Sequence, residues 1–397
     1  MIREGFLRFI YQAASMQRWN DHIRPHKGFT ELDKQAHKLF YAYVIGKFEE
    51  ETNPIDWTML IEGAFFELFQ RIVLTDIKPT IFHLLMEKHG PQINELVMKK
   101  LIEIGINDIQ PDFGERMRKY LYDTDYSRHE KRILSASHYM ATEWEFNIVY
   151  HLSSDLFGIE DTKRNIDKQL EEHQNIDGVR KLVFSHGVED FLNLVGQLRF
   201  QQRWAQTQRI PETSVAGHML IVALLSYMLS LQLDACEKRK YNNFFAGLFH
   251  DMPEVLTRDI ISPVKNSVDG LGDLIKSIEE MQMEKVLLPL LPGNWQQEIR
   301  YFTENEFADK IKMDGRIMQV STEKISQLYN DARFSPVDGG IIEFSDKFAA
   351  YLEAYLSIKH GISSQNLLDG HSSLYEKFSK TKIAGIDIGV LFDYFKL

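Results

Sequence analysis

Residues 244–265 read FFAGLFHDMPEVLTRDIISPVK, and within them a His-Asp pair interrupts an apolar run. A core made only of hydrophobic side chains needs neither an imidazole nor a carboxylate, because an unpaired polar group is costly to bury. Two interpretations are open: a core that holds two hydrogen-bonded polar groups, or a metal site. The second interpretation requires further ligands elsewhere in the chain.

The sequence around this stretch has the period of helices almost throughout. Apolar residues recur at helical spacing in segments such as DKQAHKLFYAYVIGKFEEE, NELVMKKLIEIGI and DKFAAYLEAYLSIKHG, whereas alternating, strand-like runs are scarce. The segment that begins at His218, HMLIVALLSYMLSLQLDAC, is the most apolar one. Its apolar part of about 15 residues is shorter than the roughly 20 needed to cross a bilayer, so we expect a buried core helix. The pattern predicts an all-α fold and no membrane span.

Composition limits the classes of function that the chain can have. With 397 residues, 44% hydrophobic and 26% charged, the chain is typical of a globular protein with about two to three domains. A net charge of −11 without a sustained basic stripe argues against nucleic-acid binding. The single cysteine, Cys236, cannot form an internal disulfide, and the start of the chain lacks the apolar region of a signal peptide. We therefore expect a cytoplasmic protein.

Three ordered matches between the two halves indicate an internal repeat. FLRFIYQAASMQRW (6–19) aligns with FLNLVGQLRFQQRW (191–204), QAHKLFYAYVI with VAGHMLIVALL, and residues 63–81 with residues 246–264, at offsets between 181 and 185. Two tandem helical domains are predicted, over residues 1–158 and 183–397. The charged segment 159–182 is predicted to be a connecting helix or linker.

The second copy supplies the ligands that the His-Asp pair would need. His218 opens an apolar helix, His250 and Asp251 form the pair, and Asp346 stands near the start of another apolar helix. Two imidazoles and two carboxylates suit a divalent transition ion such as Mn, Co, Ni or Zn. The alternative remains that each histidine is a hydrogen-bonded core residue, since neighbouring residues on a helix point about 100° apart.

This ordered set resembles the HD-domain phosphohydrolase superfamily, whose metal ligands follow the pattern H…HD…D. The likeness extends to the bacterial 5′-deoxynucleotidases through RW ahead of RIPETSVAGH, then HDMPE, LTRDIISPVK and SDKFAAYL, over roughly residues 190–355. The resemblance implies a metal-dependent phosphomonoesterase that acts on (deoxy)nucleoside 5′-monophosphates. Members of this superfamily that bind two metal ions carry further histidines between the His-Asp pair and the last aspartate. No histidine lies between Asp251 and Asp346, so the resemblance implies one metal ion.

The resemblance also implies roles for five residues beyond the ligands. Glu254, four residues after the histidine of the pair, would be the catalytic carboxylate, although a solvated helix glutamate has the same spacing. Arg203 and Lys265 would bind phosphate. Trp204 would pack against the sugar or base, or serve the core alone. Asp259 would recognise the sugar 3′-hydroxyl, or have a structural role.

The first copy lacks a complete ligand set. In the alignment His37 faces His218, but Leu68 faces the aspartate of the pair and Ser137 falls near the last ligand position. Because leucine cannot coordinate a metal, we expect this copy to be inactive and to pack on the second as an internal pseudo-dimer partner. Nucleotide binding by this copy is a less favoured alternative. For the whole chain, the rival hypotheses are a nucleotide-binding regulator without turnover and a phosphodiesterase.

Overall fold

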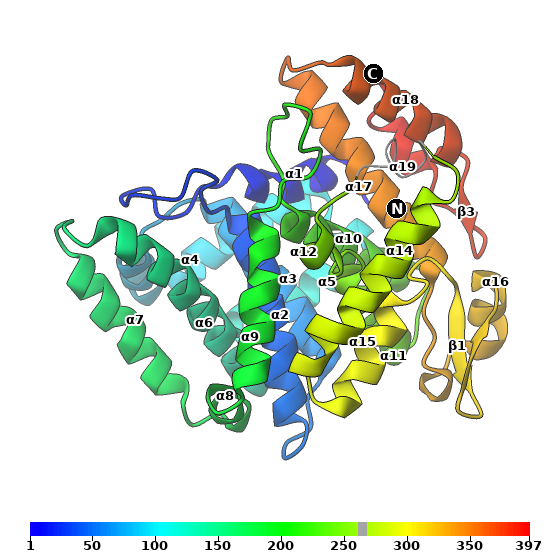
Figure 1. Cartoon of the computed structure of the whole chain (residues 1–397). Helices are drawn as coiled ribbons and strands as arrows, with labels where there is room; N and C mark the ends of the chain where they lie inside the picture. The colour runs from blue at the N-terminus through cyan, green and yellow to red at the C-terminus, as the bar shows by residue number, and fades with distance from the viewer. Residues whose placement is uncertain (261–267) are drawn as a thin grey trace. The chain divides into compact units, whose positions relative to one another are not determined.

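The computed structural model of the chain describes residues 1–260 and 268–397, and these ranges are built almost entirely of helices (Figure 1). The only strands in them form two short antiparallel ribbons, β1–β2 and β3–β4. The prediction of an all-α fold is therefore confirmed. The chain divides into two compact units, Met1–Leu192 and Asn193–Leu397, which are described separately. Lys265, one of the predicted phosphate-binding residues, lies outside the described residues.

The first unit consists of long helices whose amphipathic faces meet in one core. Its helices are α1 (Glu4–Ser15), α2 (Glu31–Glu49), α3 (Trp57–Leu74), α4 (Pro79–Ile104), α5 (Phe113–Tyr122), α6 (Arg128–Ser153), α7 (Ile159–His173) and α8 (Asp177–Val183), with a 3₁₀ turn at Ile106–Asp108. Helix α2 is buried along almost its entire length, which makes it the central helix of this unit. Helix α9 (His186–Gly196) crosses the division between the units.

The segment predicted to be a connecting helix or linker, residues 159–182, is mostly helical and is packed against the first unit. Ile159 and Ile166 of α7 form a small apolar cluster with Phe146 of α6. In α8, the amide of Gly178 donates a hydrogen bond of 2.7 Å to Glu49 of α2. The two units divide at residues 192/193, ten residues later than the predicted start of the second domain. The segment's charged outer face, read as a sign of a linker, is the solvent face of helices whose few apolar residues are buried.

The second unit is built around three packed helices. Its elements are α10 (Val215–Gln232), α11 (Glu237–Phe249), α12 (Glu254–Thr257), α14 (Leu271–Gln282), α15 (Gly293–Thr303), β1 (Lys310–Met313), β2 (Arg316–Gln319), α16 (Thr322–Lys324), α17 (Gly339–Lys359), α18 (Gln365–Phe378), β3 (Lys382–Ile383), β4 (Ile386–Asp387) and α19 (Val390–Asp393). Short 3₁₀ or π turns occur at Gln197–Arg199, Met283–Leu287, Leu288–Leu290, Ile325–Tyr329 and Ala332–Phe334.

Helix α10 forms the centre of this unit, with α11 and α17 packed against it. By length and composition it could cross a membrane, but 94% of its apolar window is buried within the protein, as predicted for a core helix. Gly247 of α11 permits the close approach of two helices, because a Cβ atom there would lie 3.0 Å from the Cα of Ala223. The close packing brings the end of α11 beside the start of α10.

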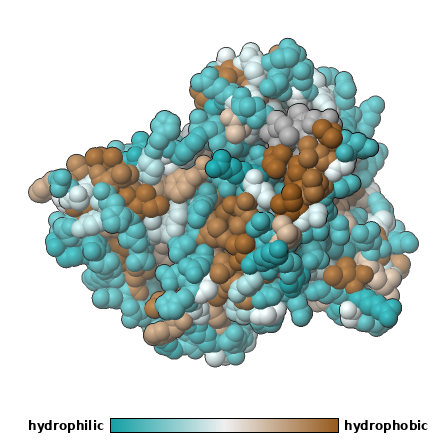
Figure 2. All heavy atoms as spheres, in the orientation of Figure 1, coloured by the Kyte–Doolittle hydropathy of each residue, from teal (hydrophilic) through white to brown (hydrophobic). Residues whose placement is uncertain are grey.

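Helix α14 differs from these core helices because its apolar side faces outward. Leu274, Ile278 and Met281 are 56%, 39% and 42% exposed and form a hydrophobic patch on the surface (Figure 2). Their spacing of three to four residues places them on one helix face. Of the residues of α14, only Ile275 is buried.

Candidate metal centre

The first turn of α10 positions His218. Ser214 is the N-cap of the helix and accepts a 2.9 Å hydrogen bond from the amide of Gly217, which fixes the start of the helix. His218 is the fourth residue of α10 and is fully buried. The apolar residues that follow it are buried on all sides of the helix, so the imidazole lies inside the protein.

The end of α11 explains how two neighbouring residues can face the same site. The helix ends at Phe249, and the chain turns through Asp251 before α12 begins at Glu254. His250 Nδ1 donates to the carbonyl of Gly247 at 2.8 Å, which leaves Nε2 as the nitrogen available to a ligand. Neighbouring residues on a regular helix point about 100° apart, but His250 and Asp251 lie in this turn after the helix, so both can face the same site.

Helix α17 contributes Asp346. Its Oδ1 atom accepts a 2.9 Å hydrogen bond from His218 Nε2, and its Oδ2 atom accepts one of 2.7 Å from Lys347 Nζ. The expectation that this aspartate stands near the helix start was wrong, because α17 begins at Gly339, two turns earlier. Glycines at the N-terminal end of the helix hid this start in the sequence pattern.

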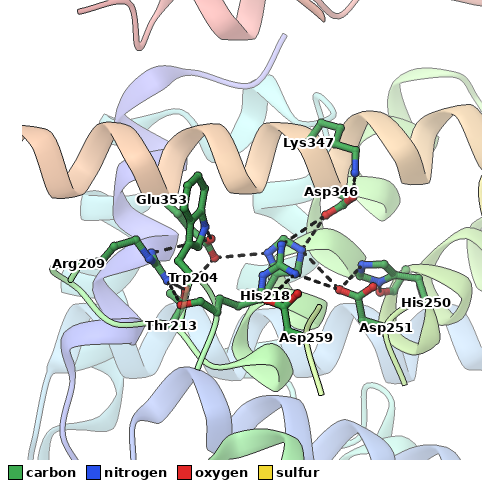
Figure 3. Close-up of polar contacts among 12 residues, drawn as sticks. Trp204, Arg209, Thr213, His218, His250, Asp251, Asp259, Asp346, Lys347 and Glu353 are labelled. Atoms are coloured by element: carbon green, nitrogen blue, oxygen red, sulfur yellow. Dashed lines mark hydrogen bonds and ion pairs between the residues drawn. The ribbon is translucent and has the colours of Figure 1, made fainter. Parts of the chain in front are cut away.

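The four predicted ligands converge in the second unit (Figure 3). Ligand atoms of His218, His250 and Asp346 all lie within 4.8 Å of one another. The Oδ2 atom of Asp251 is 3.2 Å from His250 Nε2 and 4.0 Å from His218 Nε2. His250 Nε2 is buried and makes no hydrogen bond within residues 1–260 and 268–397. An unsatisfied buried nitrogen among carboxylates fits a divalent transition ion, which takes imidazole and carboxylate ligands together.

The electrostatics of the cluster keep its carboxylates ionised. Burial opposes ionisation of Asp251, but His250 and Arg203 outweigh it and hold the pKa of this carboxyl well below its usual range. Burial likewise opposes ionisation of Asp346, and its hydrogen bond with His218 and the charge of Lys347 lower the pKa of this residue. Two ionised carboxylates at neutral pH are the form that binds a cation.

Arg203 lies beside the ligand carboxylates with its guanidinium directed at them. Its Nη1 atom is 3.4 Å from Asp259 Oδ2 and 3.6 Å from Asp251 Oδ2, and its Nη2 atom is 3.9 Å from Asp346 Oδ1. Burial lowers the pKa of Arg203, but Asp259 and Asp251 more than offset this and raise the pKa above its usual value. The structure therefore places a fixed cation and Asp259 next to the ligand cluster.

Two other predicted residues also lie in this unit. Glu254 is buried at the start of α12, and its negative charge contributes to the raised pKa of Arg203. Trp204 has a left-handed backbone, with φ of 57°, and its indole Nε1 donates a 3.0 Å hydrogen bond to Glu353 Oε2. The polar edge of this tryptophan is thus occupied by the protein itself. Its ring also contacts the backbone of α18 at Gly370.

Glu353 is a residue that the sequence reasoning missed. Its Oε1 atom lies 3.4 Å from His218 Nδ1 and accepts a 2.8 Å hydrogen bond from the hydroxyl of Thr213, and its Oε2 atom is 3.8 Å from Arg209 (Figure 3). Asp346 and Glu353 are seven residues apart on one face of α17, so the two carboxylates contact the two nitrogens of a single imidazole. A glutamate two turns after a predicted ligand, in an otherwise apolar helix, was the available signal.

Comparisons with known proteins agree with this geometry. The family model described as HD domain matches residues 195–375, a range that contains all four predicted ligands, Arg203 and Glu353. A 5′-deoxynucleotidase of Photorhabdus laumondii is 22% identical over 216 residues, which is 50% of this chain and 94% of that protein. A 5′-deoxynucleotidase of Photobacterium profundum is 27% identical over 115 residues, 27% of this chain and 57% of that protein. One of Yersinia pestis is 26% identical over 131 residues, 30% of this chain and 64% of that protein.

Proposed function

The chain belongs to the metal-dependent HD-domain phosphohydrolases through its second unit, and on this premise we propose that it is a phosphomonoesterase of (deoxy)nucleoside 5′-monophosphates. The observation that carries the proposal is the convergence of His218, His250, Asp251 and Asp346 beside the guanidinium of Arg203. Such a cluster combines a metal site with a fixed cation for phosphate. The names of the distant relatives support the nucleotide class of substrate.

One divalent ion is proposed, held by the two imidazoles and two carboxylates of the second unit. When bound, a divalent ion supplies Lewis acidity and lowers the pKa of water. The donor set favours Mn, Co, Ni or Zn over the hard, all-oxygen coordination of Ca. His250 contributes through Nε2, because its Nδ1–H is held by the carbonyl of Gly247.

Arg203 is proposed to bind the phosphoryl group. Negative charge grows on the phosphoryl oxygens during hydrolysis, and a preorganised guanidinium stabilises it more than mobile water does. Asp259, at 3.4 Å from Nη1, holds the guanidinium next to the ligand cluster. This contact supports a structural role for Asp259. Recognition of a sugar hydroxyl by its carboxylate stays a prediction.

Glu254 is proposed to move the proton. In the hydrolysis, water adds to phosphorus, the P–O bond of the ester breaks, and the nucleoside leaves with a 5′-hydroxyl. Glu254 takes a proton from the water and delivers it to the leaving oxygen. Its burial at 6% exposure keeps it out of bulk solvent, which is a property of a catalytic carboxylate and not of a solvated surface glutamate.

Trp204 is proposed to contribute its ring face to the pocket for the nucleoside. Its indole N–H is engaged by Glu353, so only the ring surface remains for a sugar or base. Stacking on an aromatic face is tolerant of the identity of the base. Selection among bases by this residue is therefore expected to be weak.

Phosphate release from a panel of ribo- and deoxyribonucleoside 5′-monophosphates tests the proposal. The protein is stripped of metal and then supplied separately with Mn, Co, Ni or Zn, and an Asp251→Ala variant is assayed in parallel. We expect release that requires a metal and is lost in the variant. A panel without release, by a protein that binds metal, would contradict the proposal in favour of a diester substrate or a regulator without turnover.

A further inference from the structure

The first unit has the same local framework as the candidate metal centre. Trp19 has φ of 57°, as Trp204 does, and its indole donates to Glu145 at 2.8 Å as that of Trp204 donates to Glu353. Gln17 forms a bridge with Thr30, and Gln202 forms one with Ser214. Thr30 and Ser214 are both N-caps that accept a hydrogen bond from the residue three positions later. These features support the predicted duplication and provide a register for comparing the two units.

In this register Lys34 corresponds to His218. Lys34 is the fourth residue of α2, as His218 is the fourth of α10. The alignment of His37 with that position was wrong in register, because His37 lies one turn later and packs edge-on against Trp144 at 4.8 Å. Apolar residues of similar spacing in the two helices made both registers plausible from sequence.

The same comparison replaces Ser137 by His138 at the last ligand position. His138 lies seven residues before Glu145, as Asp346 lies seven before Glu353. Lys34 Nζ forms a short hydrogen bond with His138 Nδ1, where the second unit has the contact between a histidine and an aspartate. Ser137 instead donates to the carbonyl of Ile133 at 2.7 Å, within its own helix.

The substitutions remove negative charge from the cluster and add positive charge to it. The second unit has one guanidinium and three carboxylates, those of Asp251, Glu254 and Asp346, at positions where a cation must bind. In the first unit the corresponding positions hold Leu68, Arg71 and His138, with Arg18 in the place of Arg203 and Lys34 in that of the first histidine. Glu67 takes the place of the second histidine, and its carboxylate is paired with Lys38 and with the hydroxyl of Tyr120. The first unit thus lacks the carboxylates of Asp251, Glu254 and Asp346 and gains the cations Lys34 and Arg71.

Lys34 lacks the partner that a buried ammonium requires. It is fully buried, and within the described residues the only hydrogen bond of its side chain is to an imidazole. Burial, and after it the charge of Arg18, lowers the pKa of Lys34 well below its usual value. Burial and the charge of Lys34 likewise lower the pKa of His138, so this ring is neutral and does not supply the missing negative charge. Glu31 and Glu145 partly offset the lowered pKa of Lys34, but neither forms an ion pair with its ammonium in the described part of the chain, so an anion in direct contact with Lys34 is missing.

The remaining cations of the cluster reach solvent. The side chains of Arg18 and Arg71 are 13% and 23% exposed, compared with 14% for Arg203. Glu31 lies 2.9 Å from Arg18 and 3.6 Å from Arg71, and Glu145 is 2.9 Å from Arg18. Glu31 therefore competes with any external anion for both guanidinium groups.

We propose that the first unit binds the phosphate group of a small phosphomonoester at Arg18, Lys34 and Arg71, without a metal ion and without hydrolysing it. Bidentate guanidinium contacts and a lysine ammonium recognise phosphate oxygens. Hydrolysis is excluded at this site because the proposed proton carrier, Glu254 in the second unit, is replaced by Arg71. This proposal concerns the first unit alone and does not depend on whether the second unit hydrolyses phosphate esters.

The test is calorimetric titration of the full-length protein with inorganic phosphate in the presence of EDTA. Removal of metal leaves the carboxylates of the second unit to repel phosphate, so saturable binding reports on the first unit. We expect about one phosphate per chain, weakened at least about tenfold by Lys34→Met, since a hydrogen bond to a charged group is lost. Methionine fills a similar volume without charge, so the variant is expected to fold. The matched variant His218→Met in the second unit should leave this binding unchanged.

A second variant changes the affinity in the opposite direction. Glu31→Gln removes the competing carboxylate and should tighten phosphate binding, while phosphohydrolase activity of the second unit stays as in the wild type. The proposal would be overturned if the wild type showed no saturable phosphate binding in EDTA, or if Lys34→Met bound phosphate as tightly as the wild type. It would also be overturned if His218→Met lost phosphate binding, or if Glu31→Gln bound phosphate no more tightly than the wild type.

Discussion

Replacement of Glu353 by glutamine is expected to weaken metal binding without removing a ligand. The carboxylate lies 3.4 Å from His218 Nδ1, and it is 2% exposed. Burial opposes its ionisation, but Arg209 and His218 outweigh this and hold the pKa of Glu353 well below its usual range. With a metal ion on Nε2, the imidazole would carry its proton on Nδ1, the nitrogen that faces the ionised Glu353. The carboxylate also makes the imidazole a more basic ligand.

The size of the effect follows from the contacts that glutamine keeps and loses. The amide can still accept from the indole of Trp204, so the side chain should stay in place. Loss of a charged partner behind a ligating histidine typically weakens metal binding about 10- to 100-fold, which is about 1.4–2.7 kcal/mol. Arg209, whose side chain is fully buried, also loses a carboxylate at 3.8 Å, so we expect the free energy of unfolding to fall by about 3 kcal/mol.

Glu145→Gln in the first unit is the matched control. Glu145 makes the same indole hydrogen bond and pairs with Arg18, but the helix that it faces carries Lys34 instead of a ligand histidine. Titration of metal-free protein with Zn or Mn, followed by calorimetry at a temperature where all variants are folded, measures the affinities. Glu353→Gln should bind metal more weakly and Glu145→Gln should match the wild type. Equal affinity of Glu353→Gln and wild type within about twofold, or equal losses in both variants, would refute the reasoning.

Three further predictions concern the reaction and the fold. Glu254→Gln should lower kcat by about 10²–10⁴-fold with metal affinity unchanged, as measured by steady-state kinetics and metal titration; activity within tenfold of the wild type would contradict its role as proton carrier. Arg203→Lys should lower kcat by about 10²-fold, because a lysine cannot reproduce the bidentate guanidinium contacts, and an unchanged kcat would assign Arg203 to the fold alone. Burial lowers the pKa of Lys310 from 10.5 to about 8, so between these values the unfolded chain binds the proton that the folded chain has released. Stability should therefore rise with pH across this window by up to about 3 kcal/mol, and urea unfolding of Lys310→Met should lack this rise; identical pH profiles for the two proteins would show that Lys310 does not titrate as described.

The ligand set was proposed from polar residues in apolar stretches of the sequence and, above all, from the resemblance of their order to the HD-domain pattern. The period of the hydrophobic residues predicted the helical fold. Asp346 was proposed as a ligand at the start of its helix; the helix starts at Gly339, yet Asp346 still faces His218, because it lies on the side of α17 that packs against α10. Hydrophobic periodicity is a property of a single helix, so it can be read from the sequence of that helix alone.

What the sequence did not predict depends on contacts between elements. Glu353 could not be assigned to His218 before α17 was known to pack against α10. The register of the first copy was ambiguous because α2 and α10 are both buried along almost their whole length, and the N-caps Thr30 and Ser214 distinguish the two registers. The predicted packing of the two copies as a pseudo-dimer stays a prediction.

The metal content of the purified protein tests the central claim most directly. After treatment with a chelator, reloading with Mn, Co, Ni or Zn and removal of free ions, metal per chain is measured by atomic emission for the wild type, His250→Ala and the first-unit variant Glu67→Ala. The account predicts about one ion per chain in the wild type and in Glu67→Ala, and almost none in His250→Ala. Two ions in the wild type, or an ion retained by His250→Ala and lost by Glu67→Ala, would contradict a single metal centre in the second unit.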